Sequence, residues 1–288
     1  MPLILDGKKA AEALAAALQE KVKLWPAALT LSVIQVGARA DSNAYIKAKT
    51  AFAEKIGVKV ELVKFPEDIL EEIVTSAVLE RNNRTDIQGI IVQLPLPAHW
   101  DADVILENII PEKDVDALTA KNVKNLLAGR AGLMPATAAG ILKLLEFYGL
   151  PLSGKRALVV GRSLMVGKAI ALAFLNQDAT VTICHKKTEN LAALAKEADI
   201  LVVAAGRPAL IGKDCVKAGQ VVIDVGINEV PGGKLDEEIF GRKLVGDVKF
   251  DEVSPIVAAI SPVPGGVGPM TVAALFSNLL DLVGNLKY

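Results

Sequence analysis

The sequence contains few of the residues on which disulfide frameworks and metal sites depend. Its 288 residues include two cysteines, Cys184 and Cys215, and two histidines, His99 and His185. Two cysteines are too few for the disulfide framework of a small secreted protein, which favours a reducing compartment. The histidines lie far apart, and neither has a second histidine or a cysteine at the spacing of zinc ligands. We therefore expect no metal site.

The sequence also lacks long apolar runs and an excess of one charge. No window reaches the roughly 18 uninterrupted apolar residues of a membrane-spanning helix. The first residues, MPLILDGKKAAEAL, lack the basic stretch and long apolar run of a signal peptide. With 32 Lys and Arg against 33 Asp and Glu, the charge balance predicts binding neither to nucleic acid nor to a membrane. These features predict a cytoplasmic location.

The chain has instead an alternation of apolar strands and helical segments, with 52% hydrophobic residues overall. Its length favours about two domains. The first series of segments comprises a strand at 31–36, a helix at 41–57, a strand at 58–65, a helix at 67–83 and a strand at 87–93. This order predicts a mostly parallel sheet with helices packed over its faces.

A second series follows a less regular region and a helix at about 138–148. It comprises apolar strands at 155–161, 179–184, 199–205 and 220–226, with helices at about 166–176 and 189–197. Strands this continuously apolar are typical of a parallel sheet covered on both faces. We therefore predict an α/β fold with domains at 1–118 and 119–268. An amphipathic helix that begins at Pro269 is expected to pack back onto the first domain.

The segment VVGRSLMVGKAIA follows one predicted strand and opens a helix, which is where a dinucleotide phosphate-binding turn belongs. Gly161 permits the tight turn and Gly167 permits close packing of the helix on the sheet. Ser163 stands where the middle glycine of G-x-G-x-x-G is usual. By the pattern alone, an ordinary turn between a strand and a helix remains an alternative.

The end of the next predicted strand bears on the choice of cofactor. Folds that prefer NAD place a carboxylate about 20 residues past the glycine turn. Here the strand ends in Cys184-His185-Lys186-Lys187, and no carboxylate occurs before Glu189. Lysines and the nearby Arg162 would attract a ribose phosphate. We therefore predict NADP over NAD, with a solvated pair of loop lysines as the alternative.

Tyr45 and Lys49 are four residues apart on a predicted helix and so share a face. This helix follows the carboxyl end of a strand, where open α/β sheets bind their ligands. Burial of a lysine there would lower its pKa and let it exchange protons near neutral pH. By themselves, a tyrosine and a lysine on one helix are more often surface residues.

Three further segments favour a site. Gln93, in VQLPLP, places an amide at the end of a buried strand, and Asp114 and Asp116 place carboxylates in a loop. Residues 262–271, PVPGGVGPMT, form a Gly- and Pro-rich run at the start of a helix. Such a run permits close backbone approach to a ligand and offers free N–H groups. Each segment also fits an ordinary loop, although ten residues of tight turns cost stability unless something is bound.

The motifs of the whole chain, in their order, resemble those of one enzyme family. They are VGARADSNAYIKAK, IIVQLPLP, PEKDVDAL, VVGRSLMVGKA, ATVTICHKKT, VVIDVGIN, LVGDVKFDEV and SPVPGGVGPMTVA. The resemblance is to the bifunctional methylenetetrahydrofolate dehydrogenase/methenyltetrahydrofolate cyclohydrolase family, the FolD proteins. It implies a folate-binding α/β domain and a Rossmann domain, with the active site in the cleft between them.

The resemblance implies two reactions in one-carbon folate interconversion, which supplies purine biosynthesis. Methylene-tetrahydrofolate gives a hydride to NADP, and the methenyl product is hydrolysed to formyl-tetrahydrofolate. A homodimer through the Rossmann domain is implied in the same way. No metal is needed, which agrees with the missing metal ligands.

The resemblance also implies roles for residues. Lys49 is the catalytic lysine, Tyr45 packs on the folate, Gln93 tunes the lysine and Asp116 binds the pterin, and these four form the catalytic set. Further substrate contacts are implied at Leu94, Pro264, Gly265 and Gly266. Cofactor contacts are implied at Gly161, Arg162, Ser163, Val166, Gly167, His185, Lys186, Thr188, Ile227, Gly268 and Thr271.

The sequence departs from the family pattern at several positions. Ala117 stands where KDVD is usually followed by Gly, and its Cβ restricts the backbone there. MPATAAG replaces the usual PCTP-x-G, and Ala169 replaces a usual Pro. Lys186 stands where a Ser is common, which strengthens the argument for a bound 2′-phosphate.

Three other functions compete with this interpretation. The first is a dehydrogenase without cyclohydrolase activity, against which the presence of Lys49 argues. The second is another two-domain dehydrogenase, acting on a shikimate-like or amino-acid-like substrate. The third is a nucleotide-sensing or scaffold protein without enzymatic activity, because a fold does not imply a function.

Overall fold

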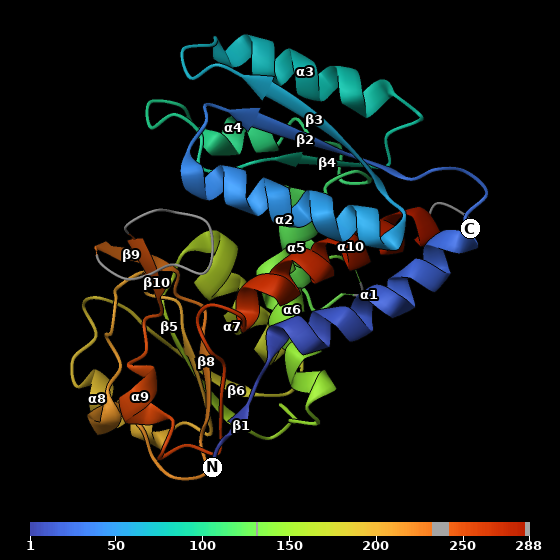
Figure 1. Cartoon of the computed structure of the whole chain (residues 1–288). Coiled ribbons are helices and arrows are strands. Elements are labelled where there is room, and N and C mark those ends of the chain that lie inside the picture. The colour runs from blue at the N-terminus through green and yellow to red at the C-terminus, as the bar shows by residue number, and fades with distance from the viewer. Residues whose placement is uncertain (131, 232–241, 286–288) are drawn as a thin grey trace. The chain divides into compact units, whose positions relative to one another are not determined.

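A computed structural model of the protein describes residues 1–130, 132–231 and 242–285, and Figure 1 shows its elements. The chain forms two compact units. Unit 1 comprises Met1–Ala11 and Thr137–Thr271, and unit 2 comprises Glu12–Ala136 and Val272–Tyr288. The predicted α/β class with two parts is confirmed. The units have other bounds than the sequence ranges 1–118 and 119–268, since the N-terminal residues group with the later part of the chain.

Unit 2 contains a parallel three-stranded sheet with the order β3-β2-β4. The strands are β2 (Thr30–Val36), β3 (Lys59–Phe65) and β4 (Gly89–Val92). Helix α2 (Ala40–Ile56) connects β2 to β3, and helix α3 (Glu71–Asn83) connects β3 to β4. Each connection is a crossover helix, as parallel strands of one sheet require.

The central strand β2 is buried along its whole length because helices cover both faces of the sheet (Figure 1). Leu31 and Val33 pack in a cluster with the apolar face of α2. Ile34 and Val36 point the other way and pack with α3. This alternation places successive side chains in two separate cores, so the strand is apolar throughout rather than at every second position.

Helix α10 (Val267–Asn285) corrects one prediction. It begins at Val267, two residues before Pro269, which occupies the first turn, where its missing N–H is tolerated. The helix is largely apolar: Val267–Gly284 has a mean hydropathy of 1.4, and 72% of it is buried. Length and composition alone would let it cross a membrane, but a mostly buried apolar helix is also what the core of a folded unit contains. Phe276, for example, stacks on Phe52 of α2.

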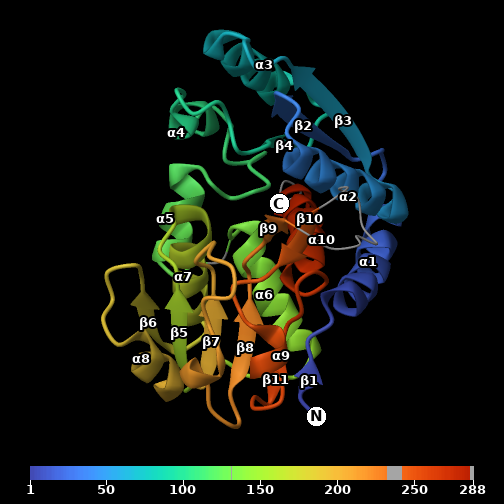
Figure 2. The same cartoon turned by 60° about the vertical axis from the view of Figure 1, so that its left-hand side comes forward.

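Unit 1 contains a parallel six-stranded sheet with the order β1-β11-β8-β7-β5-β6 (Figure 2). Its strands are β1 (Leu3–Ile4), β5 (Arg156–Val160), β6 (Thr180–Cys184), β7 (Ile200–Val203), β8 (Val221–Asp224) and β11 (Ala259–Ile260). Strand β5, the first strand of the second predicted series, lies between β6 and β7. This doubly wound order creates a switch point between β5 and β7, where such folds bind ligands.

Several predicted bounds differ from the structure. Helix α3 begins at Glu71, because residues 67–70 form a turn and an extended segment instead of the first turn of a helix. The helix expected at 166–176 consists of a π-helical turn, η1 (Leu164–Lys168), followed by α7 (Ala169–Leu175). Strand β1 and helix α1 (Gly7–Lys23) were not predicted. A strand of two residues is too short to show a pattern.

The remaining elements lie in the connections between the strands of the two parallel sheets. They are α4 (Ala102–Leu106), α5 (Ala120–Leu127), α6 (Ala136–Phe147), α8 (Leu191–Glu197), η2 (Lys213–Cys215), β9 (Asn228–Pro231), β10 (Arg242–Val245) and α9 (Phe250–Val253). Strands β9 and β10 pair with each other as an antiparallel sheet.

Candidate active site

The predicted catalytic lysine is buried in unit 2. Lys49 lies on α2 and is only 8% exposed. Its Nζ donates a hydrogen bond of 2.9 Å to Oε1 of Gln93, the residue that follows β4. The sequence marked both residues independently, and the fold brings them together because α2 covers the sheet face from which Gln93 projects.

The amide of Gln93 can present only its oxygen to the lysine. Its Nε2 donates a hydrogen bond of 2.8 Å to the carbonyl oxygen of Leu94, which fixes the orientation of the amide. Leu94 is joined to Pro95 by a cis peptide bond. When Lys49 is neutral, one of its N–H groups is held by Gln93, and its lone pair therefore points away from the amide. A base needs this arrangement to accept a proton.

Burial lowers the pKa of Lys49, and the negative charge of Asp116 opposes this effect. Burial raises the pKa of the Asp116 carboxyl group, and the positive charge of Lys49 opposes that effect. At both groups, the loss of hydration on burial changes the pKa more than the attraction between the two charges does. The pKa of Lys49 therefore lies below its ordinary value, so more of this lysine is neutral than of a solvent-exposed one, and a neutral amine can act as a base.

Asp114 and Asp116 have different surroundings, although they are two residues apart. Asp114 is 1% exposed, and its Oδ2 accepts hydrogen bonds from the backbone N–H of Thr119, at 2.8 Å, and from Nδ2 of Asn122, at 2.9 Å. These bonds hold the loop that carries Asp116. The sequence marked both acids, but only the structure separates the carboxylate that supports the loop from the one that acts on Lys49.

Ala117 keeps a glycine-like backbone conformation. Its φ is 56°, its side chain is fully buried, and its N–H bonds to the carbonyl oxygen of Asp114 at 3.2 Å. A left-handed conformation costs an alanine roughly 1–2 kcal/mol. The backbone at Ala117 thus keeps the left-handed conformation that suits the glycine usual at this position, and the alanine carries the cost.

Tyr45 and Gln35 are two further polar residues, on α2, which carries Lys49, and on β2, the strand before it in the chain. Tyr45, one turn earlier on α2, is partly buried, and burial raises the pKa of its hydroxyl group, with a contribution from Asp41. Gln35, on β2, is 1% exposed and donates from Nε2 to Oδ1 of Asn43 at 2.7 Å. Its buried Oε1 has no hydrogen-bond partner within the part of the chain that the structure describes. The signal that could have marked Gln35 is a polar residue inside the apolar run LSVIQV.

In unit 1, the glycine turn lies at the carboxyl end of β5, at the switch point of the sheet. Gly161 has a φ of 134°, and a Cβ there would clash with the carbonyl oxygen of Ala204. A Cβ at Gly167 would clash with the carbonyl oxygen of Gly161. Ser163 caps the π-helical turn η1, and its Oγ accepts from the N–H of Gly167 at 3.4 Å. Both glycines are thus required by close packing, as a phosphate-binding turn demands.

Of the other residues in this turn, Arg162 and Ser163 are exposed and Val166 is partly buried. The loop after β6 is held by His185 and Thr188: the N–H of His185 donates to Oγ1 of Thr188 at 2.9 Å, and the N–H of Thr188 donates to the carbonyl oxygen of His185 at 2.8 Å. This leaves Lys186 and Lys187 exposed at the turn.

The Gly- and Pro-rich run has a role besides the expected one. The carbonyl oxygen of Gly265 accepts from the N–H of Gly7 at 2.8 Å, and a Cβ at Gly7 would clash with the carbonyl oxygen of Gly266. The N–H of Gly266 donates to the carbonyl oxygen of Pro262 at 2.9 Å, so it is not one of the free N–H groups that the sequence suggested. Part of this run therefore serves the packing of α1.

The remaining predicted residues lie in unit 1. Pro264 follows a cis peptide bond, a Cβ at Gly268 would meet open space, and Thr271 Oγ1 donates to the carbonyl oxygen of Val267 at 3.2 Å. Ile227, in the loop after β8, is 45% exposed. Asp224, at the end of β8, was not predicted. Burial raises the pKa of its carboxyl group to about 6.

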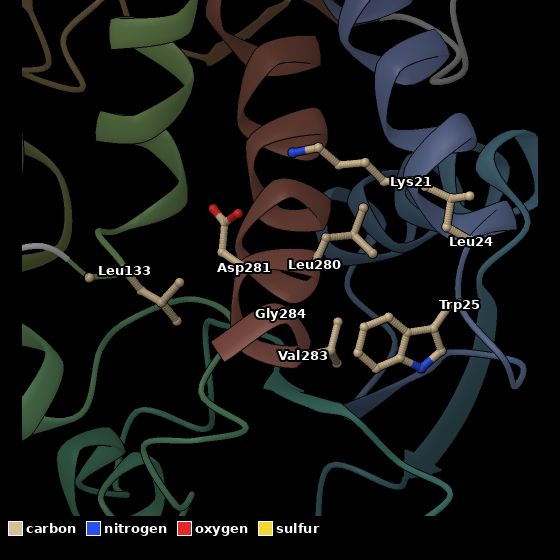
Figure 3. A pocket seen from close by; sticks show the side chains of 9 residues that line it. Lys21, Leu24, Trp25, Leu133, Leu280, Asp281, Val283 and Gly284 are labelled. Atoms are coloured by element: carbon tan, nitrogen blue, oxygen red, sulfur yellow. The ribbon is translucent and has the colours of Figure 1, made fainter. Parts of the chain in front are cut away.

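A separate pocket of about 510 Å³ lies in unit 2 (Figure 3). It is lined by Lys21, Leu24, Trp25, Gly132, Leu133, Leu280, Asp281, Val283 and Gly284. None of the predicted site residues lines it. In the described residues, no cluster of three or more His, Cys, Asp or Glu side chains could hold a metal ion.

Two family models match the chain. Residues 5–116 match the catalytic domain of tetrahydrofolate dehydrogenase/cyclohydrolase, and residues 135–286 match the NAD(P)-binding domain of the same enzyme. The bifunctional protein FolD of Methanospirillum hungatei is 44% identical over 98% of this chain and 98% of its own length.

Solved structures agree with the family models. The bifunctional enzyme FolD of Campylobacter jejuni is 40% identical, with a TM-score of 0.92, over 99% of this chain and 100% of the other. The Trypanosoma brucei FolD, solved with NADP and an inhibitor, is 36% identical, with a TM-score of 0.94, over 99% of this chain and 98% of the other. The chain therefore belongs to the tetrahydrofolate dehydrogenase/cyclohydrolase family.

Proposed function

We propose that this protein oxidises methylene-tetrahydrofolate to methenyl-tetrahydrofolate with NADP and hydrolyses the methenyl form to formyl-tetrahydrofolate. The observation that carries the proposal is the buried Lys49 amine, held at 2.9 Å by Gln93 and facing the charge of Asp116. Unit 2 is assigned the folate, and unit 1, with its glycine turn, is assigned NADP.

In the hydrolysis, the neutral amine of Lys49 accepts a proton from the water that attacks the methenyl carbon. This forms a neutral hydroxyl adduct and an ammonium group. The ring then opens as one carbon–nitrogen bond breaks, and the ammonium group returns a proton to the leaving nitrogen. The hydroxyl proton leaves as the formyl C=O forms, so one proton is released overall. A lysine that stayed charged would repel the methenyl cation, and a depressed pKa removes this repulsion.

In the oxidation, the side chains of the protein bind and orient the folate. When bound, NADP accepts the hydride from the methylene carbon. Such a step needs positioning more than a side-chain acid. Tyr45 offers a ring to stack on the folate, and Asp116 offers a carboxyl group that binds the pterin. Leu94, Pro264 and the glycines after it are the further proposed substrate contacts.

The cofactor fits the turn after β5, because Gly161 and Gly167 leave room that a Cβ would fill. The start of η1 and α7 offers N–H groups for the phosphates. Preference for NADP over NAD rests on Lys186, Lys187 and Arg162, which are exposed. The same two segments carry the proposed contacts Ser163, Val166, His185 and Thr188. The other proposed contacts are Ile227, in the loop after β8, and Gly268 and Thr271, on α10.

A homodimer is proposed to form through unit 1. Strand β6 is the last strand of its sheet, and Ile183 on it is 42% exposed. Leu175, at the end of α7, is 55% exposed. An edge strand with exposed apolar side chains is a surface suited to pairing with another chain. Sedimentation of wild type and Ile183→Lys tests this: a shift from dimer to monomer supports it, and a monomeric wild type refutes it.

The proposed product is a formyl donor for one-carbon transfer, including purine biosynthesis in the cytoplasm. One assay tests the enzymatic proposal: NADP reduction and methenyl absorbance are followed together, in wild type and in a Lys49 variant. Wild type should show both reactions. Inactivity with methylene-tetrahydrofolate and NADP would favour a different dehydrogenase, and tight NADP binding without turnover would favour a sensor.

A further inference from the structure

A buried carboxylate organises the loop after β7 in unit 1. Asp247 is fully buried. Its Oδ2 accepts from the N–H groups of Ala205, at 2.7 Å, and Gly206, at 2.9 Å, and its Oδ1 accepts from the N–H of Arg207 at 2.8 Å. Three successive N–H groups converge on one carboxylate because Gly206 has a φ of 61°, as in a backbone anion nest.

The same carboxylate also holds the loop after β8. Its Oδ1 accepts from Nδ2 of Asn228 at 2.8 Å. Asn228 directly follows Ile227, one of the proposed cofactor contacts. Since β7 and β8 are parallel neighbours, both loops leave the same edge of the sheet. Asp247 therefore connects two loops at the edge where a doubly wound sheet binds its ligand.

The loop after β7 also packs on the glycine turn. The carbonyl oxygen of Ala204 is the atom with which a Cβ at Gly161 would clash. A displacement of residues 204–207 would therefore change the surroundings of the phosphate-binding turn directly. The N–H of Ala205, in the same peptide group, points the opposite way and donates to Asp247. Asp247 therefore contacts this loop on the side that faces away from the glycine turn.

Asp247 is itself held in place by Asp224. Oδ1 of Asp224 accepts from the N–H of Asp247 at 3.0 Å, and its Oδ2 accepts from the N–H of Val248 at 2.9 Å. A Cβ at Gly226 would clash with the carboxyl group of Asp247, and a Cβ at Gly246 would clash with that of Asp224. Two glycines are thus placed where they make room for two buried carboxyl groups. A buried charge is costly unless several donors compensate it, and here four donors converge on Asp247.

We propose that Asp247 is a positioning residue for NADP: it holds the loops after β7 and β8 in the shape that the bound dinucleotide requires. It acts through these loops and touches none of the reacting atoms. The inference rests on the proposed function and names, within the same site, a residue that determines affinity for the cofactor.

Asp247→Asn tests the inference. Asparagine keeps the shape, but whichever way its amide is turned, its NH₂ group faces two donors. We expect the KM and the Kd for NADP to rise at least about tenfold, the effect of roughly one lost hydrogen bond to a charged group. Methenyl hydrolysis, measured without NADP, should keep its kcat/KM within about twofold, because its four proposed catalytic residues lie in unit 2 and none of them belongs to the loops that Asp247 holds.

Two further variants keep the test decisive. Asn228→Ala removes one of the four donors and should raise the Kd for NADP by about threefold; it carries the test if Asp247→Asn does not fold. Asp251→Asn changes an exposed aspartate on α9 and should leave both activities unchanged.

An unchanged Kd for NADP in Asp247→Asn would overturn the inference. So would an equal loss of both activities in Asp247→Asn and Asn228→Ala, because that pattern indicates general support of the fold. If wild type fails to oxidise methylene-tetrahydrofolate, the proposed function is what fails. The Kd for NADPH, followed by the fluorescence of NADPH itself, then still decides the role of Asp247.

Discussion

The lysine cluster of unit 2 and the glycine turn of unit 1 are built by different means. The lysine cluster consists of side chains: a buried amine, an amide oriented by its own hydrogen bond, and a carboxyl group whose charge acts on the amine. The glycine turn and its surroundings consist mainly of backbone: the close-packed Gly161 and Gly167, the N–H groups of η1, and the loops after β7 and β8, which Asp247 holds.

Because of this difference, we expect the two reactions to respond to different kinds of substitution. Hydrolysis depends on a tuned pKa, so it should respond to isosteric changes that remove or add a charge. Cofactor binding depends on close approach of the backbone, so it should respond to added volume. Methenyl hydrolysis therefore serves as a control for variants in unit 1, and NADP binding serves as a control for variants in unit 2.

The largest effect is expected for Lys49→Met. Loss of a general base should lower methenyl hydrolysis by about 10²- to 10⁴-fold. The affinity for NADP should not change, and the melting temperature should not fall, because methionine fills the space without a charge to desolvate. Lys47→Met, on the exposed side of α2, is the matched control. Hydrolysis at the wild-type rate in Lys49→Met would remove the lysine from the mechanism.

A large effect on the other activity is expected for Gly161→Val, which should weaken NADP binding and leave methenyl hydrolysis intact. The new side chain would clash with the carbonyl oxygen of Ala204. Overpacking of this kind costs about 1–3 kcal/mol, and the same free energy lost from cofactor binding corresponds to a rise of about 5- to 150-fold in the Kd for NADP. Titration of NADPH fluorescence measures it, and methenyl hydrolysis reports whether unit 2 is intact. Unchanged cofactor binding would show that this turn is not the phosphate site.

A smaller effect is expected for the double substitution Lys186→Glu and Lys187→Glu. Reversal of these exposed charges should raise the KM for NADP about tenfold while the KM for NAD changes little, because only NADP carries the 2′-phosphate. Lys196→Glu, a single charge reversal at an exposed position on α8, is the control. Equal changes for both cofactors would favour the alternative, a solvated pair of lysines.

The smallest effect is a shift in pH dependence for Asp116→Asn. Hydrolysis needs neutral Lys49, so kcat/KM should rise with pH through the pKa of this lysine. The charge of Asp116 raises that pKa against the larger effect of burial. Its removal should therefore move the rising limb of the profile to lower pH, even if kcat/KM falls at every pH. Asp103→Asn, exposed on α4, is the control; a shift to higher pH would contradict the assigned charge interaction.

The sequence by itself determined the α/β class, the family and most of the strands. The runs at 31–36 and 155–161 are apolar because both faces of each sheet are covered, and this burial leaves a pattern that can be recognised locally. Glycines that permit close packing, such as Gly161, also leave a local pattern. Gln93 could be marked as a polar residue at the end of an apolar strand, and Lys49 as a residue one turn after Tyr45 on a predicted helix, with its role implied by the family resemblance.

Only the tertiary structure decided which of these residues meet and what state they are in. Lys49 and Gln93 are 44 positions apart, and the direction of the amide depends on a bond to Leu94 that no spacing announces. The pairing of β1 with β11 and the four bonds to Asp247 likewise join segments far apart in the chain. Burial and hydrogen bonding are properties of neighbours in space, so a pKa that depends on them is established only when the chain has folded.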